Sequence, residues 1–413
     1  MSTDPVEDFV ALAARHERMF WLDGGGSRAW SGRRSILGGL HEKDVSLTYD
    51  ADARQVTRHQ HGGSEVVGDD PFVVLAAEVA RDAGDPRVSW VGYFGYACRP
   101  DLPATTTGSA VPDAVWMRLR DPVFVEHEPG PATMLGSHGG APAVPPDYAA
   151  ALEAVQHQLR SGNSYEVNLT YREQLGSPVD PVTAYLRLRT ASPAPYAGFL
   201  RHHGVHLLSS SPERFATLGR DGWLETKPIK GTTPRGATAA EDAAQRHSLA
   251  TDPKYRAENL MVVDLLRNDL STVCDPGTVE VPVLMEVESY ASVHQLVSTV
   301  RGRLRAGVGT VEALRALFPA GSMTGAPKLR TMRIIEEVER SARGVYAGAF
   351  GWVGADGRAD LGVVIRSLVA IRDGAGWRYE LGTGGGITVR SEVAQEYAET
   401  RWKADRLRAA VRP

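Results

Sequence analysis

Four charged residues near the C-terminus occur at spacings that place them on one face of a helix. They are Glu392, Glu396, Glu399 and Lys403, and steps of three and four residues return to the same side of an α-helix. Such a face is most often solvated and held by salt bridges. The preceding glycine-rich segment 382–387 favours a ligand-facing role instead, because glycines permit close backbone approach and leave N–H groups available for an anion.

Two further residues could take part in chemistry. Glu258 precedes an apolar run near an expected helix start, where a carboxylate could cap the helix or face a cavity and bind a hard cation. Lys230 lies in segment 225–236, which Pro228 and Pro234 stiffen. Composition alone favours a surface turn with a solvated lysine. The alternative is a nucleophilic amine, which needs apolar or cationic surroundings to lower its pKa.

A glycine-containing loop at 318–328 ends in a lysine and opens a helix. It fails as a phosphate-binding loop, because two residues separate the last glycine from Lys328 and no Ser or Thr follows. Two interpretations remain open: a helix start with Thr324 as N-cap and Pro327 in the first turn, or ligand-facing N–H groups. His294 could equally be a hydrogen-bonded core residue or part of a site.

Both helices and strands are expected to position these residues. Helical periodicity and capping residues predict one set of segments, and short alternating apolar runs predict another. The expected helices are 71–83, 148–161, 181–190, 239–271 with a break near 252, 311–318, 326–342 and 391–410. The expected strands include 88–96, 115–126, 165–171, 344–353, 362–372 and 377–389. This mixture, without repeats of fixed period, predicts an α+β fold whose strand order the sequence does not reveal.

Length and composition restrict the class of protein. The 413 residues are 42% hydrophobic and 23% charged, enough to bury a large core. A net charge of −4 gives no broad basic field, so we expect no nucleic-acid partner. Cys98 and Cys274 are too few for a disulfide framework, which fits a cytoplasmic protein. The chain has neither a secretion-signal pattern nor an apolar stretch that spans a bilayer, so we expect no membrane partner.

A shift in composition predicts the domain organisation. Residues 128–147 are rich in Pro, Gly, Ala and Ser, which is typical of a connection. We therefore expect an N-terminal region at 1–127, a linker at 128–147 and a catalytic region at 148–407.

Taken together and in order, the motifs resemble those of the family that contains anthranilate synthase, aminodeoxychorismate synthase, isochorismate synthase and salicylate synthase. The resemblance covers about 148–404, and segments 20–39 and 88–97 resemble the family's N-terminal part. No single motif suffices, but their order is specific. The motifs are GNSYEVNLT from Gly162, SSSPERF from Ser209, PIKGT from Pro228, AENLMVVDLLRNDL from Ala257, VHQLVSTVRG from Val293, PAGSMTGAPK from Pro319, YAGAFG from Tyr346, VIRSL from Val364, GTGGGI from Gly382 and EYAETRWKA from Glu396.

The resemblance implies a two-lobed α+β fold in which two antiparallel sheets form a sandwich with helices outside. It also implies a Mg²⁺ site in which Glu258 and Glu399, with Glu396 nearby, hold the ion against the ring carboxylate of chorismate. Such a site is chemically reasonable, because Mg²⁺ prefers a few carboxylates plus an anionic substrate.

The resemblance further implies a set of residues that bind the substrate. Arginine offers paired donors to a carboxylate and lysine a point charge. The implied substrate-binding residues are Tyr346, Arg366, Lys403, the backbone N–H groups of Gly384 and Gly385, Thr232, His294 and Thr324.

The subfamily is inferred chiefly from Lys230. Family members that make 4-amino-4-deoxychorismate carry PIKGT, whereas the anthranilate, isochorismate and salicylate enzymes carry alanine at that place. The implied mechanism has Lys230 add at C2 of chorismate as the C4 hydroxyl leaves, and Glu213 exchange protons with the C4 oxygen. Water-using members have lysine at position 166 and many ammonia users have glutamine. Glu166 departs from both.

The ammonia is expected to come from a partner. Neither cysteine lies in a glutaminase motif, so we expect a separate glutamine amidotransferase subunit in a heterodimer. The product would serve p-aminobenzoate synthesis, for folate or for another metabolite. The alternatives are the large subunit of an anthranilate synthase, or a non-catalytic relative that binds chorismate.

Overall fold

Two large antiparallel β-sheets form the centre of the molecule. The computed structural model describes residues 5–26, 34–106, 108–127, 143–290 and 293–413. The first sheet has nine strands, and every described pairing within it is antiparallel. Its order is β17 (Gly325–Ala326), β9 (Glu166–Ser177), β21 (Gly376–Ile387), β20 (Ser367–Asp373), β11 (Val205–Ser211), β10 (Tyr196–His202), β1 (Arg18–Asp23), β2 (Arg34–Leu40) and β8 (Val123–Glu126).

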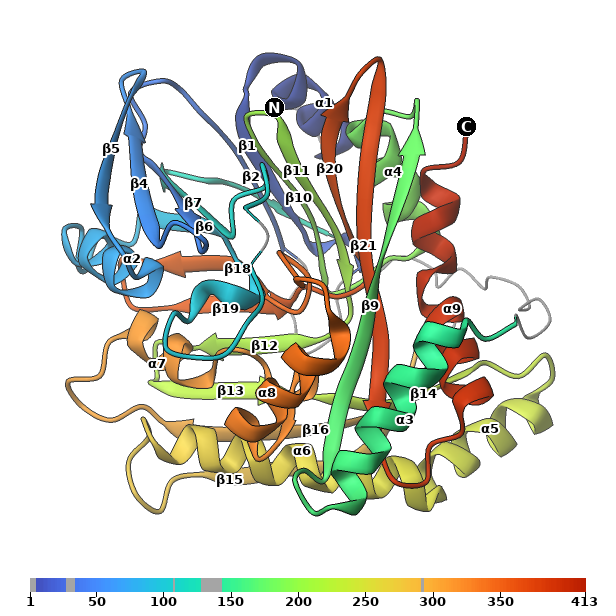
Figure 1. The fold of residues 1–413 in the computed structure, drawn as a ribbon. Coiled ribbons are helices and arrows are strands. Elements are labelled where there is room, and N and C mark those ends of the chain that lie inside the picture. Colours follow the sequence, from blue (N-terminus) through green and yellow to red (C-terminus); the bar gives the residue numbers. More distant parts are fainter. Residues whose placement is uncertain (1–4, 27–33, 107, 128–142, 291–292) are drawn as a thin grey trace.

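The second sheet has twelve strands. In Figure 1, β12, β13 and β16 of this sheet run across the view, whereas β9 and β21 of the first sheet run from top to bottom. Its order is β14 (Ile229–Pro234), β16 (Val293–Arg303), β13 (Trp223–Lys227), β12 (Arg214–Leu218), β19 (Ala359–Val363), β18 (Ala349–Gly354), β6 (Val88–Phe94), β7 (Ala114–Arg120), β3 (Ser46–Asp50), β4 (Gln55–Gln60) and β5 (Gly63–Gly68), with β15 (Glu280–Ser289) beside β16.

Helices cover the outer faces of these sheets (Figure 1). Helix α9 packs against β21, α6 against β16, and both α3 and α8 against β9. The predicted α+β fold with two antiparallel sheets and helices outside is confirmed. The helices are α1 (Pro5–Arg15), α2 (Pro71–Ala80), α3 (Pro146–Arg160), α4 (Pro181–Ala191), α5 (Ala239–Thr251), α6 (Pro253–Ser271), α7 (Thr310–Leu317), α8 (Lys328–Glu339) and α9 (Val393–Ala410).

Capping residues begin several helices where the sequence predicts them. Asp70 and Asp180 each accept backbone hydrogen bonds at the start of α2 and α4. Thr238 and Glu241 form a reciprocal capping box at the start of α5. Asp252 caps α6 directly before a proline, so the predicted break in segment 239–271 is confirmed.

Two expected strands each prove to be two strands in different sheets. The segment 115–126 divides at Asp121, whose φ is 55°, into the end of β7 and β8. The segment 362–372 divides at Arg366, whose φ is 49°, between β19 and β20. A residue in the left-handed region turns the chain sharply, so it ends the pairing on one side. The patterns of apolar residues continue across both turns, which is why they do not reveal the division.

The sequence also misses or misplaces other features. Helix α1 was not expected, and the expected N-cap Thr324 is wrong, because α8 begins only at Lys328 with Pro327 in the N-cap position. The expected regions 1–127 and 148–407 are not separate units, since β1 pairs with β10 and β6 pairs with β18. The expected linker lies largely outside the described residues. No helix in the described part of the chain is long and apolar enough to cross a membrane.

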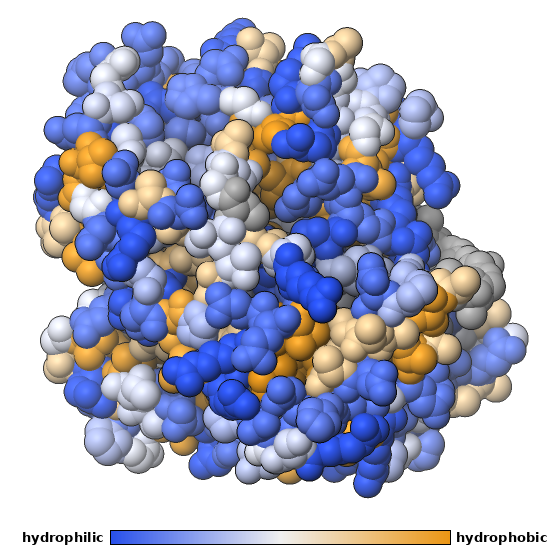
Figure 2. Space-filling view, viewed as in Figure 1, coloured by the Kyte–Doolittle hydropathy of each residue, from blue (hydrophilic) through white to orange (hydrophobic). Residues whose placement is uncertain are grey.

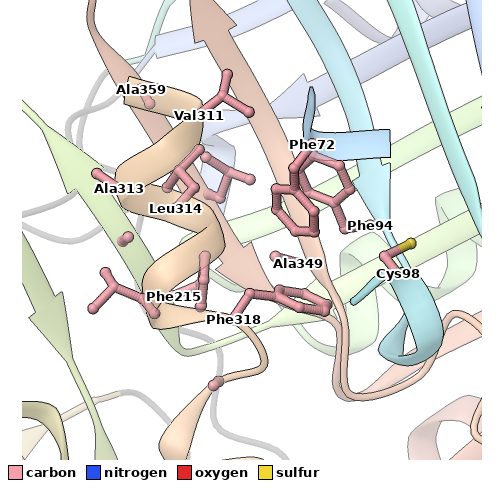
Figure 3. Close-up of a cluster of buried hydrophobic side chains, with 14 of the residues drawn as sticks. Phe72, Phe94, Cys98, Phe215, Val311, Ala313, Leu314, Phe318, Ala349 and Ala359 are labelled. Carbon is pink, nitrogen blue, oxygen red and sulfur yellow. The ribbon is translucent and has the colours of Figure 1, made fainter. Parts of the chain in front are cut away.

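A buried aromatic cluster anchors one loop of the second sheet. Figure 3 shows Phe72 and Phe94 face to face beside Phe318, with α7 on the other side. The rings of Phe72 and Phe94 lie 3.9 Å apart, and those of Phe215 and Phe318 lie 5.9 Å apart. Phe318 opens the loop to η3 (Gly321–Met323), so this packing positions that loop. The face of the molecule shown in Figure 2, in contrast, is mostly hydrophilic, with hydrophobic residues in separate patches.

Phe318→Ala should lower the free energy of unfolding by about 3–5 kcal/mol, because it removes a fully buried ring and leaves a cavity. Urea unfolding followed by circular dichroism measures the change. Phe124→Ala is the matched control, since Phe124 is 52% exposed and its loss should cost less than about 0.5 kcal/mol. Equal losses in the two variants would contradict the structural role of the cluster.

Candidate active site

A cavity lies where strands of the two sheets meet α6 and α9. It encloses about 900 Å³, a volume typical of small-molecule sites. Residues far apart in the sequence converge on it. Its lining contains these sequence-predicted residues: Glu213, Lys230, Thr232, Glu258, Tyr346, Arg366, Gly384, Gly385, Glu396, Glu399 and Lys403.

Two of these residues lie where the chain crosses from one sheet to the other. Glu213 follows β11 of the first sheet and precedes β12 of the second. Arg366 lies between β19 of the second sheet and β20 of the first. Both side chains line the cavity. The crossings therefore bring an acid and a guanidinium to the same cavity.

Lys230 lies in the cavity and not on the surface. The residue is 7% exposed, and its Nζ donates a hydrogen bond to Glu166 Oε1, in an ion pair with a residue that is 1% exposed. Burial lowers the pKa of Lys230, but the carboxylates of Glu166 and Glu258 outweigh burial and raise it above its ordinary value. The surroundings of Lys230 are therefore acidic, and not the apolar or cationic ones that would lower the pKa of a nucleophilic amine.

Glu213 is a buried acid whose pKa lies near neutral pH. Burial raises its pKa to about 7, although the hydroxyl of Ser322 donates a 2.6 Å hydrogen bond to Oε1 and opposes that rise. A carboxyl group with such a pKa can both give and accept a proton at neutral pH. Ser322 belongs to η3, the loop that Phe318 anchors.

Three acidic residues gather on the α6 and α9 side of the cavity. Glu396 accepts a 2.5 Å hydrogen bond from Lys254, and Glu399 pairs with Lys403 at 2.7 Å. Glu258 Oε1 has no hydrogen-bond partner in the described residues, and burial raises the pKa of its carboxyl to about 8. Lys254 Nζ lies 3.9 Å from this oxygen, an ion-pair distance too long for a hydrogen bond, so the oxygen keeps unused hydrogen-bonding capacity.

This set of donors fits a divalent cation. Mg²⁺ binds through carboxylate oxygens, and the unpartnered oxygen of Glu258 is buried at the cavity wall. Within the described ranges, no three His, Cys, Asp or Glu side chains are close enough together to hold a metal by themselves. Glu396 and Glu399 are paired with Lys254 and Lys403.

Other residues of the cavity wall offer hydrogen-bond donors. Burial and the nearby Arg406 lower the pKa of Arg366 to about 10, which leaves the guanidinium charged at neutral pH. The Tyr346 ring packs against the backbone of Gly382, where any side chain would overlap the ring. Burial raises the pKa of Tyr346 to about 12, so its hydroxyl remains a donor. Together these groups can bind a carboxylate.

Two predicted lining residues lie outside the cavity. His294 is fully buried, with Nδ1 bonded to the Ser289 hydroxyl and Nε2 bonded to Asp242. The next residue on β16, Gln295, lines the cavity because successive strand side chains point in opposite directions. The Thr324 hydroxyl bonds to Gly321 O within its own turn. Neither residue lines the cavity, and their role in binding substrate stays a prediction.

Other cavity residues were missed from the sequence. Lys254 lies one helical turn before Glu258, a spacing that could have indicated an ion pair. Ser322 lies inside the motif PAGSMTGAPK, but nothing in its sequence neighbourhood indicated that this serine belongs to the site. The lining also includes Asn168 and Gln295, which lie inside the quoted motifs GNSYEVNLT and VHQLVSTVRG but were not assigned a role, and Tyr255, which lies outside the quoted motifs.

Comparison with known proteins identifies the family of this chain. A family model for chorismate binding enzymes matches residues 140–409. The chain belongs to the chorismate-binding enzyme family. The match contains every cavity residue that the sequence predicts.

Similar proteins match this chain over different parts of its length. Aminodeoxychorismate synthase of Streptomyces pristinaespiralis is 40% identical over 98% of this chain and 63% of its own length. An anthranilate synthase component 1 of Haloarcula marismortui is 44% identical over 64% of this chain and 53% of its own. The structure of anthranilate synthase component I from Streptococcus pneumoniae is 26% identical, covers 92% of each chain and superposes with a TM-score of 0.74. This chain thus spans about 63% of the length of the first relative.

Glu213 should titrate near pH 7 in the folded protein, and Ser322→Ala should raise that midpoint by removing a hydrogen bond to the carboxylate. The folded protein binds this proton more tightly than the unfolded chain does. Stability from this group therefore falls as pH rises from 4.5 to about 7. Infrared titration of the carboxyl band, assigned with Glu213→Gln, measures both effects. A midpoint that Ser322→Ala leaves unmoved would contradict the assignment.

Proposed function

We propose that this chain is the synthetic subunit of an aminodeoxychorismate synthase, which converts chorismate and ammonia to 4-amino-4-deoxychorismate. The observation that carries the proposal is the position of Lys230, 7% exposed in the wall of the cavity. A surface turn would leave this lysine solvated, as composition alone suggested. The similarity to the Streptomyces aminodeoxychorismate synthase over 98% of this chain supports the same conclusion.

The cavity residues divide the reaction between a nucleophile and an acid. The Lys230 amine adds at C2 of chorismate while the C4 hydroxyl leaves, and the double bonds of the ring shift between them. Glu213, with a pKa raised to about 7, gives its proton to the departing hydroxyl, which leaves as water. Ammonia then enters at C4, Glu213 takes back a proton and the lysine departs. Two displacements retain the geometry at C4.

Charge complementarity orients the substrate, which carries two carboxylates. Arg366 and Tyr346 receive one carboxylate, with support from the N–H groups of Gly384 and Gly385. Lys403 adds positive charge at the same wall, where its Nζ bonds to Gly384 O. Glu258, with Glu396 and Glu399, would hold Mg²⁺, which supplies positive charge for the other carboxylate.

The ammonia comes from a partner glutamine amidotransferase subunit in a heterodimer. Burial raises the pKa of both Cys98 and Cys274, so neither thiol is a reactive thiolate of the kind a glutaminase needs. The name "component 1" of the Haloarcula relative also refers to a synthase of more than one component. The aminated product would serve the synthesis of p-aminobenzoate, for folate or for another metabolite.

An anthranilate synthase is the second candidate, and the 44% identity to the Haloarcula protein favours it. That reaction ends with aromatisation and loss of pyruvate and does not need a lysine nucleophile. A non-catalytic role is disfavoured, because Lys230, Glu213 and Glu258 are all buried at one cavity where their charges cost stability.

The chain, given chorismate, Mg²⁺ and ammonium, should form 4-amino-4-deoxychorismate, because Lys230 provides the covalent route to substitution at C4. Liquid chromatography with mass detection identifies the product, and chelation of the metal with EDTA should abolish its formation. A reaction mixture without ammonium is the control. Direct release of anthranilate and pyruvate would show that the second candidate is right.

Lys230→Ala should lower the rate of this amination by at least roughly 10³-fold, a loss expected when a covalent nucleophile is removed. Steady-state kinetics measure the loss, and isothermal titration calorimetry should find that chorismate still binds. Lys43→Ala is the matched control, because Lys43 is exposed. Unchanged kinetics in Lys230→Ala would exclude the lysine as nucleophile.

A further inference from the structure

Glu166 has no role in the reaction as derived so far, although it is buried in contact with Lys230, which lines the cavity. It is the first residue of β9 and is 1% exposed. Its Oε1 accepts a hydrogen bond from Lys230 Nζ, and its Oε2 has no hydrogen-bond partner in the described part of the chain. A carboxylate with one oxygen on the nucleophile and the other unpartnered requires an explanation.

The nucleophile has a proton to lose before it can react. An ammonium group has no lone pair, and the charges around Lys230 hold it in that form. Little water reaches a residue that is 7% exposed, so the proton needs an acceptor in the protein. Glu213 already serves the C4 hydroxyl and bonds to Ser322. Glu166 is the group to which Lys230 Nζ donates its hydrogen bond in the described residues.

We propose that Glu166 is the catalytic base that removes the proton from Lys230 and so creates the amine nucleophile. This inference rests on the proposed function, because it gives Glu166 a task only if Lys230 attacks the substrate. The proton moves along a hydrogen bond that already exists, so no rearrangement of the two side chains is needed.

Substrate binding provides the driving force for this transfer. In water an ion pair of lysine and glutamate is strongly favoured, but a low dielectric disfavours both charged forms. A substrate that fills the cavity expels water from it. The pair then gains by becoming a neutral amine and a neutral carboxylic acid. The charge of Lys230 also interacts with three further carboxylates, which influence whether the ionic or the neutral pair is favoured. They are those of Glu258, Glu213 and Glu399.

The protons balance over the whole cycle. Glu166 takes one proton from the Lys230 ammonium, and the amine forms its bond to C2 through the freed electron pair. Glu213 protonates the C4 oxygen, which leaves as water. Ammonia bonds to C4 and loses one proton to Glu213. The lysine leaves C2 as a neutral amine with the C–N electron pair and regains its proton from Glu166, so both acids return to their starting states.

The backbone beside the pair is shaped to accommodate it. Gly386 on β21 lies against both side chains, and a Cβ at this position would overlap Glu166 Oε1 and approach Lys230 Nζ to 3.1 Å. The two strands pair in register, with Val167 opposite Ile387. The pairing of β9 with β21 thus positions the Glu166 carboxylate, which lies at hydrogen-bond distance from the Lys230 amine on β14, as a general base requires.

The test compares Glu166→Gln and Glu166→Asp with the unchanged chain in a single turnover. Each protein, with Mg²⁺, is mixed with chorismate without ammonium and quenched in acid after set intervals. Mass spectrometry then follows the Lys230 peptide for a gain of one substrate less one water. Glu173→Gln is the matched control, because Glu173 lies on the same strand and pairs with Arg401 and Arg408.

The unchanged chain and Glu173→Gln should form the adduct at similar rates. Glu166→Gln should form it at least about 100-fold more slowly, and Glu166→Asp should recover part of that loss because it keeps a carboxylate. In Glu166→Gln the rate should also rise steeply with pH, since solvent must now remove the proton. The unchanged chain should lack this steep rise. Calorimetric titration with chorismate shows that each variant keeps a folded site.

Two outcomes separate the possible failures. An adduct that forms in Glu166→Gln at the unaltered rate and with the unaltered pH profile would overturn the role of Glu166 alone. An unchanged chain that forms no adduct on Lys230 would instead overturn the covalent route, and with it the proposed function.

Discussion

Charge buried without water must be compensated, and this requirement organises the cavity. Lysines compensate several of its carboxylates directly: Lys230 pairs with Glu166, Lys254 with Glu396 and Lys403 with Glu399. Glu213 is compensated differently, because burial shifts its pKa to about 7 and a neutral hydroxyl supports it. Glu258 keeps one oxygen without a partner. Groups whose charge or hydrogen bonds are only partly compensated within the protein are those to which the proposed chemistry assigns a substrate, a cation or a proton.

The architecture explains how so many charges can share one cavity. Strands of both sheets and two helices each contribute a few polar residues, while a large apolar cluster borders the cavity at Met323 and Tyr346. Crossings between the sheets add Glu213 and Arg366, and the aromatic packing of Phe318 fixes the loop that carries Ser322. The apolar core stabilises the fold, so the cavity residues can be arranged to bind charged groups.

Much of the fold could be predicted from local patterns. The helices follow from periodicity and from caps such as Asp70, Asp180 and Asp252, because a cap acts within one turn of its own position. The strand assignments were less complete. Segments 115–126 and 362–372 each change sheet at a residue with positive φ, and an apolar run looks the same whether it continues or turns. Sheet order depends on distant partners and was not predictable.

For the site, the sequence by itself determined which residue types are available and in which motifs, and most of the expected residues do line one cavity. Only the tertiary structure decided which of them meet. Lys230 and Glu166 are 64 positions apart, and their contact depends on how β9 and β14 approach from different sheets. His294 and Gln295 are adjacent, yet one faces Asp242 and the other the cavity. Motifs carry chemical identity because it is local, whereas side-chain environment and pKa depend on three-dimensional neighbours that no local pattern encodes.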